Sequence, residues 1–175
     1  MPAHRGEAVL ALDTFRTMAQ YNRWMNGRLY AVCAEIPDGE RKRDRGAFFK
    51  SIHGTFNHLL LGDRLWLGRF LERPFPVDSL DQELYADFHE LRTERGRTDE
   101  EILDFSGSLD EAALARDFRF TTIVDPREHV FPFRHVLLHF FNHQTHHRGQ
   151  LTTLIKQAGY EPGVTDLMWL PGTEQ

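Results

Sequence analysis

The chain has 175 residues, of which 41% are hydrophobic and 27% charged, and its formal net charge is −5. This length and composition exclude an intrinsically disordered chain and predict one globular domain over residues 1–175. The acidic balance argues against a nucleic-acid partner, which would need a clustered basic face. The densest basic run, residues 41–45, is interrupted by Asp44 and is typical of a solvated loop.

The single cysteine, Cys33, rules out an internal disulfide framework and favours a reducing cytoplasm. It lies in an apolar stretch, so we expect a buried and unreactive thiol. Residues 1–7 do not have the pattern of a signal peptide, and no apolar run reaches the roughly 18 residues of a membrane-spanning helix. We therefore expect a cytoplasmic protein that does not enter a membrane.

Two helices are predicted in the first part of the chain. Apolar residues recur every three or four positions from about residue 8 to 36 and from about 46 to 71, which is the helix period. Pro37-Asp38-Gly39 ends the first helix, and a charged loop follows to about Arg45. The second helix is apolar over a wide arc, which favours a central position in the fold.

A third helix is expected to begin at a capping box, Ser79-Leu80-Asp81-Gln82, after an extended segment that contains two prolines. Its apolar positions continue to Phe105. Gly96 and the cap-like sequence Thr98-Asp99-Glu100-Glu101 leave open a kink or a break near residue 97.

The composition changes after this helix. Residues 118–124 are β-branched and aromatic and predict a short strand, which a turn connects to a returning strand at 128–131. The last long helix is expected over about 132–158, and the apolar side chains of the tail, 165–175, are expected to pack on the body or on a second subunit. Four long helices with one small hairpin predict an all-α fold, an antiparallel four-helix bundle with a β-hairpin before the last helix.

The last helix carries four of the ten histidines of the chain within HFFNHQTHHRGQ, residues 139–150. Helix residues four apart lie on one face, so a stripe is formed by His135, His139, His143 and His147. Residues eight apart are separated by about 12 Å of helix and cannot easily share an ion. The spacing therefore permits the pairs 135/139, 139/143, 143/147 and 143/146, whereas positions 146 and 147 point about 100° apart.

Two imidazoles from one helix do not complete a metal site, so a third ligand is expected from the second helix, which offers His53 and His58. The H-E-x-x-H pattern of zinc proteases is absent because residues 144–146 contain no glutamate. The Glu-x-x-His spacing of di-iron bundles, a Gly-rich phosphate loop and a G-x-S-x-G elbow are absent too. The stripe favours a metal site over the polar edge of a helix, but spacing alone does not choose the ligands.

The segment HQTHHRGQ, residues 143–150, resembles the H-x-x-x-H-R-G-Q signature of the DinB/YfiT-like metalloenzyme family. Residues 51–67 (SIHGTFNHLLLGDRLWL) resemble the second helix of that family, where a histidine precedes a tryptophan by about eight residues; here these are His58 and Trp66. Tyr21-Asn22-Arg23-Trp24 is similar to its first helix. The resemblance covers nearly the whole chain.

The resemblance implies a four-helix bundle, often a homodimer, with a divalent metal held by one histidine of the second helix and two of the fourth. Carried over by position, the metal ligands are His58, His143 and His147. The additional histidines at positions 53, 139 and 146 leave open ligand exchange or a different pair. Hydrogen-bond partners for the imidazole N–H groups are expected among the amides Asn57, Asn142 and Gln150.

Three neutral imidazoles leave a divalent ion with its full charge and an open position, which is typical of catalytic sites. The expected cofactor is a divalent transition metal, with zinc or nickel favoured. Such an ion lowers the pKa of bound water towards about 7, or binds a thiol as thiolate. We therefore expect a metal-dependent enzyme acting on a small molecule, either a hydrolase or a thiol-dependent S-transferase that uses a low-molecular-weight thiol.

Relatives of this family in the wider fold include thiol transferases and a maleylpyruvate isomerase, so the resemblance slightly favours thiol chemistry. The alternative is a non-catalytic, stress-associated metal-binding or interaction protein, because the family name refers to damage-inducible expression. Two further residues of the signature carry expectations. Arg148 is expected to form an ion pair on the bundle surface, with an anionic substrate group as the alternative partner, and Gly149 suggests the close approach of a neighbouring helix.

Overall fold

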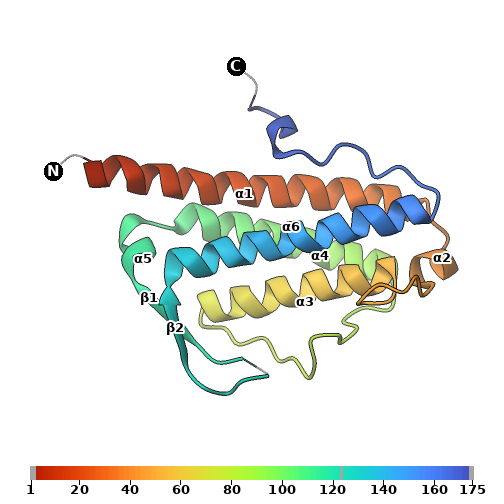
Figure 1. Cartoon of the computed structure of the whole chain (residues 1–175), viewed down its shortest axis with the longest axis horizontal. Coiled ribbons are helices and arrows are strands. Elements are labelled where there is room, and N and C mark those ends of the chain that lie inside the picture. The colour runs from red at the N-terminus through yellow and green to blue at the C-terminus, as the bar shows by residue number, and fades with distance from the viewer. Residues whose placement is uncertain (1–2, 123, 174–175) are drawn as a thin grey trace.

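The computed structural model describes residues 3–122 and 124–173. Four long helices and a two-stranded sheet account for most of the chain, with shorter helices at the connections (Figure 1). The elements in chain order are α1 (Ala3–Ala34), α2 (Asp38–Lys42), α3 (Ile52–Phe70), α4 (Phe88–Ser108), α5 (Glu111–Ala115), β1 (Asp117–Phe120), β2 (His129–Pro132), α6 (Phe133–Gln157) and the 3-10 helix η1 (Leu167–Trp169).

The four long helices α1, α3, α4 and α6 form the bundle. Helix α1 packs antiparallel to α4, and α3 packs antiparallel to α6. Helices α3 and α4 run in the same direction because the long connection between them, residues 71–87, crosses back along the outside of the bundle (Figure 1). The predicted fold class, a helical bundle with a small antiparallel hairpin before the last helix, is confirmed.

The core has two parts along the bundle axis. One part lies towards α2 and includes Met25, Leu29 and Leu60, all fully buried. The other lies towards the hairpin, where aromatic rings dominate: Phe70 stacks on Phe105 with ring centroids 5.1 Å apart. The sole cysteine belongs to the first part, and burial raises the pKa of the Cys33 thiol to about 12, as expected of an unreactive side chain.

Helix α3 begins at Ile52 rather than near residue 46. Ser51 caps it by accepting a hydrogen bond from the Gly54 backbone N–H at 3.0 Å. The preceding residues, 46–50, form a tight turn in which the backbone N–H of Lys50 donates to the Ala47 carbonyl at 2.8 Å. Residues 38–42, predicted as loop, form the short helix α2.

The predicted start of the third long helix at Ser79 is wrong. Ser79 and Asp81 instead form a local turn, and α4 begins at Phe88, where Asp87 caps it by accepting from the Glu90 N–H. The reason is tertiary. The Asn57 side chain on α3 accepts from the backbone N–H groups of residues 84 and 85 and so holds this segment against α3 in a non-helical conformation.

Helix α4 continues past Gly96 without a break. The cap-like residues Thr98 and Asp99 lie inside the helix because their side chains have other partners. Thr98 donates to the Glu94 carbonyl at 2.9 Å, and Asp99 is buried against polar side chains of α1. The open question of a kink near residue 97 is therefore answered by a continuous helix.

The hairpin pairs β1 with β2 in antiparallel register, with Phe118 opposite Phe131. The first strand ends at Phe120, earlier than the predicted residue 124, because the Thr122 side chain and backbone pair with the Asp125 carbonyl in a turn. Ile123, which belongs to the predicted strand, lies outside the described residues.

The tail packs back along α1, as Figure 1 shows. Arg28 of α1 donates to the Val164 carbonyl at 2.8 Å, and Leu170 is buried in the core. The neighbouring Met168 and Trp169 remain 68% and 48% exposed, so only part of the expected packing occurs within the chain. Within residues 3–122 and 124–173, no helix has the length and apolar character needed to cross a membrane.

Candidate metal centre

Three histidines converge where α3 crosses α6. His58 is on α3, and His143 and His147 occupy successive turns of α6. The His58 Nε2 atom lies 3.3 Å from the Nε2 of His143 and 3.2 Å from the Nε2 of His147. One ring nitrogen from each side chain lies within 4.8 Å of the other two, a spacing at which the three could share one ion.

Two of the rings are oriented through their second nitrogen. The His58 Nδ1 lies 2.9 Å from the Leu80 carbonyl, and the His147 Nδ1 lies 2.8 Å from Oε1 of Gln150. Both partners are acceptors, so each Nδ1 donates its proton and each Nε2 carries a lone pair that points towards the other ring. A hydrogen bond on the outer nitrogen is how proteins orient metal-binding imidazoles.

Two of the distances between the ring nitrogens match those expected around a metal ion. Two imidazole nitrogens at about 2.0–2.1 Å from a tetrahedral zinc ion lie about 3.3–3.4 Å apart. The observed separations of 3.2 and 3.3 Å are close to this value. Because two of the lone pairs face each other without a proton between them, a cation at their centre would remove the repulsion.

The three rings are held neutral, which is the protonation state that binds metals. Burial lowers the pKa of His58 to about 4, and the nearby His147 lowers it further while the Leu80 carbonyl opposes the shift. Burial also lowers the pKa of His143 to about 3, with the neighbouring imidazoles acting in the same direction. The pKa of His147 is lowered as well, again chiefly by burial.

A glycine on α3 makes room for one of the rings. A Cβ added at Gly62 would lie 3.1 Å from Cε1 of His143, closer than ordinary van der Waals contact. Only the missing side chain lets the His143 ring lie against the α3 backbone. The sequence contained a signal for this role, since Gly62 directly follows the run Leu59-Leu60-Leu61 inside a helix, where glycine is destabilising.

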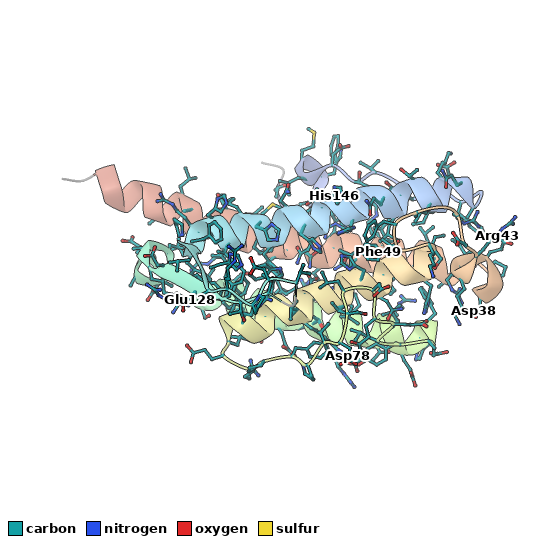
Figure 2. The ribbon with its side chains drawn as sticks, turned by 60° about the horizontal axis from the view of Figure 1, so that its bottom comes forward. Asp38, Arg43, Phe49, Asp78, Glu128 and His146 are labelled. Carbon is teal, nitrogen blue, oxygen red and sulfur yellow. The ribbon has the colours of Figure 1, made fainter. Side chains whose placement is uncertain are left out.

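Phe49 covers one side of the cluster, and sequence reasoning placed it only as an apolar position of the second helix. Its ring stacks on His58 with centroids 3.7 Å apart and an interplanar angle of 15°. It also meets the edge of His147 at 5.5 Å. Figure 2 shows Phe49 at the crossing of α6 and α3, while His146 lies on the outer side of α6.

Phe49 also lines a pocket of about 320 Å³ beside the site. The pocket has apolar and charged walls, with Phe48, which is 85% exposed, at its edge. Side chains of both charges face it: Lys42, Asp44, Lys50, Asp81 and Glu83. The three clustered histidines do not line it, so Phe49 lies between the pocket and the cluster.

The remaining histidines of interest have other partners. His53 is buried, and its Nε2 lies 2.8 Å from the Tyr85 carbonyl. His139 is exposed and lies against the Trp66 ring, with centroids 5.4 Å apart. His146 is exposed and accepts from Nε2 of Gln150 at 3.2 Å. The structure therefore places none of these three in the cluster that His58 joins.

Of the three amides expected beside imidazole, the structure places only Gln150 there, where it contacts both His147 and His146. Asn57 instead binds backbone groups of residues 53, 84 and 85. Asn142 is exposed on the outer side of α6. The Leu80 carbonyl, which takes the expected amide role for His58, comes from a loop whose path the sequence pattern did not predict.

The expectations for Arg148 and Gly149 are wrong. Arg148 is only 4% exposed and donates to the Asn22 side chain of α1 and to Thr145, so it neither forms a surface ion pair nor faces a substrate. It points inwards because the apolar face of α6 is wide enough to include position 148. Gly149 is exposed, and a Cβ added there would have no described atom within 4 Å.

Comparison with known proteins identifies the same family as the histidine signature on α6. The sequence pattern of the DinB family matches residues 4–175. The chain is 26% identical to the protein DinB of Bacillus subtilis (strain 168), over 84% of this chain and 87% of that protein. Its fold is similar to the crystal structure of a DinB-like protein from Bacillus cereus ATCC 10987, with a TM-score of 0.57 and 18% identity over 80% of this chain and 90% of that one. The chain belongs to the DinB family.

Proposed function

We propose that the protein is a divalent-metal-dependent enzyme that acts on a small-molecule substrate, with His58, His143 and His147 as the metal ligands. One observation carries the proposal: three imidazole Nε2 atoms from two helices converge, and two of the rings are oriented by carbonyl oxygens on their far side. Three neutral nitrogen ligands leave a divalent ion with an open coordination position, as in catalytic zinc sites.

A bound ion of this kind would supply Lewis-acid chemistry, either activating water or stabilising a substrate thiol as its thiolate. The protein contributes the environment. Phe49 excludes water from the face of His58 on which it stacks, and Gln150 and the Leu80 carbonyl fix the ring orientations. Zinc and nickel both accept three imidazole ligands, and we propose one of these as the cofactor.

The size of the pocket beside Phe49 is consistent with a small substrate. A volume of about 320 Å³ is at the lower end of the range for ligand sites. Its walls combine the Phe48 and Phe49 rings with the cationic Lys50 and the anionic Glu83, which suits a compact molecule that carries both charges. A low-molecular-weight thiol with amino and carboxylate groups has this character, so we propose thiol transfer ahead of hydrolysis. Because Phe49 lies between the pocket and the cluster, the thiol would reach the ion when the Phe49 ring turns aside.

The metal assignment is tested by elemental analysis of the protein after loading with Zn²⁺ or Ni²⁺ and removal of free ion. We expect one ion per chain in the wild type and strong loss of metal in His58→Ala and His143→Ala. The matched control is His139→Ala, which removes a histidine of the same stripe that lies outside the cluster. Equal metal content in the wild type and in both ligand variants would refute the assignment.

Turnover is tested separately, with fully loaded protein. Conjugation of an electrophile with a panel of cellular thiols is measured beside hydrolysis of esters and amides. Failure of every reaction by a protein that carries one ion per chain would favour a non-catalytic metal-binding role instead. The homodimer implied by the family resemblance belongs to the same proposal, and light scattering of the purified protein measures it directly.

A further inference from the structure

Directly behind the histidine cluster, the interior of the bundle contains a group of buried polar side chains. Asp63 of α3 and Gln144 of α6 are 1% and 0% exposed, and Nε2 of Gln144 donates to Oδ1 of Asp63 at 2.9 Å. Oδ2 of the same carboxylate accepts from Arg95 of α4 at 2.6 Å. Burying polar groups costs free energy unless they are paired with one another, as these are. Their presence in the interior of the bundle therefore requires an explanation.

The hydrogen bond between Asp63 and Gln144 is made by the residues that directly follow Gly62 on α3 and His143 on α6. Gly62 contacts the ring of His143, and the next residues along each helix, Asp63 and Gln144, bind each other. Successive helix residues point about 100° apart, so the two contacts lie on adjacent faces of a single crossing. One contact faces the cluster, and the other faces the interior of the bundle.

The carboxylate of Asp63 is itself anchored to the other two helices. Arg95, which binds it, also lies 2.9 Å from Asp99 one turn further along α4. Asp99 accepts hydrogen bonds from Asn22 and Asn26 of α1 at 3.0 and 2.9 Å. A slip of α6 along α3 would therefore break the bond between Gln144 and Asp63, because Arg95 keeps the Asp63 carboxylate from following.

We propose that Asp63 and Gln144 are positioning residues for the metal centre. Their hydrogen bond holds α6 in the register that brings His143 and His147 to His58. The inference rests on the proposed metal site, because it explains how the geometry of that site is maintained. A shift of 1 Å or less along the helix axis would change the separations of 3.2 and 3.3 Å between the Nε2 atoms, to which metal affinity is sensitive.

The test compares two substitutions within the same buried group. Gln144→Met keeps the volume and removes the donor to Asp63, while Asp99→Asn removes one carboxylate partner of Arg95 and leaves the Asp63–Gln144 bond in place. Both variants should lose stability, which denaturant unfolding measures. The affinity for Co²⁺ is measured by competition with a chelator, and the visible absorption of the Co²⁺ protein reports the geometry of its ligands.

We expect Gln144→Met to bind Co²⁺ at least about tenfold more weakly, with an altered absorption spectrum, and Asp99→Asn to stay within about twofold of the wild type. Asp63→Asn keeps an oxygen that can accept from Gln144, so we expect an intermediate loss; it also serves as the test variant if Gln144→Met does not fold. Wild-type affinity and spectrum in the Gln144 and Asp63 variants would overturn the inference, as would an equal loss in Asp99→Asn. A wild-type protein that binds no Co²⁺ would instead overturn the proposed metal site.

Discussion

Four histidines of α6, at positions 139, 143, 146 and 147, lie close together on one helix, yet they divide into two groups with different surroundings. His143 and His147 face α3, where burial lowers the pKa of both imidazoles and His58 lies opposite. His139 and His146 are exposed, and no histidine of α3 lies opposite them: His139 lies against a tryptophan ring and His146 beside an amide side chain, and each touches a cluster histidine only from the same helix. The comparison shows that spacing along a helix produces candidates, and that a partner on a second helix selects among them.

The largest difference in metal affinity should appear when one histidine of each group, at neighbouring positions, is replaced by alanine. We expect His147→Ala to weaken Zn²⁺ binding by at least about 100-fold, because a tridentate site would lose a ligand. His146→Ala, one residue away on the outer side, should change affinity by less than about threefold, since it alters only the outer environment of Gln150. Chelator competition measures both, and similar losses in the two variants would contradict the division.

The metal-free protein should show the same division in its pH dependence. His58 and His143 have folded-state pKa values of about 4 and 3, below the ordinary value of about 6.5 in an unfolded chain. Below pH 6.5 the unfolded chain therefore binds protons that the folded protein does not. Summed over the two groups, the free energy of unfolding should fall by on the order of 5–6 kcal/mol as the pH falls from about 6.5 to about 4, with little contribution from these groups above that range.

Urea unfolding of chelator-treated protein between pH 7 and pH 4 measures this dependence. In His143→Gln one of the shifted groups is absent, so the fall in stability should be smaller than in the wild type. His146→Gln, which removes an exposed histidine outside the cluster, is the matched control for the substitution itself. An identical dependence in the wild type and His143→Gln would show that burial of this ring does not oppose its protonation.

Gly62, beside the cluster, and Gly149, on the exposed side of α6, allow a second comparison between the inner and outer sides of the site. Gly62→Ala should push the His143 ring away from α3 and weaken metal binding by roughly tenfold, because the new Cβ would lie 3.1 Å from the ring. Gly149→Ala is the matched control: its Cβ has no described atom within 4 Å, and alanine should stabilise the helix by up to about 1 kcal/mol. Metal affinity and thermal unfolding separate the two outcomes.

The smallest effect concerns the aromatic cover. Phe49→Ala removes the ring that stacks on His58, so water should reach that imidazole and its pKa should rise towards the ordinary value. We expect a loss of metal affinity of about threefold, because all three ligands remain. Phe48→Ala, at the exposed neighbouring position, is the control. NMR titration of His58 in the two metal-free variants measures the difference, and equal pKa values in both would contradict a shielding role.

Much of the fold followed from local pattern. The periodic apolar positions predicted the four long helices, and the β-branched run with its turn predicted the hairpin. The errors occurred where a distant side chain supplied the decisive bond. The segment from Ser79 has a helix-capping sequence, but Asn57 of α3 binds the backbone further along and keeps it out of a helix. Asp99 resembles a cap and is instead buried inside α4 by its contacts with α1.

The candidate site was reached from the sequence in two steps of different kinds. Helix geometry limited the histidines of α6 to neighbouring pairs, and the resemblance to the DinB family chose one pair and added His58. The structure brings that set together. The supporting residues were harder to predict, because Phe49, Gly62 and Leu80 contribute stacking, the absence of a side chain and a backbone carbonyl. Gly62 left a signal in the sequence, a glycine inside a helix, whereas ring stacking and a backbone carbonyl have no spacing that a sequence pattern could reveal.

The sequence by itself determined the helices, the family and the short list of histidines, because these depend on residue type and on a fixed rotation per residue. Tertiary structure alone decided which side of α6 faces α3, and with it the burial of Arg148, the exposure of Gly149 and the environment of each imidazole. The physical reason is that burial and ring orientation depend on the packing of several helices at once. That packing depends on bonds between residues far apart in the chain, such as the one between Asp63 and Gln144.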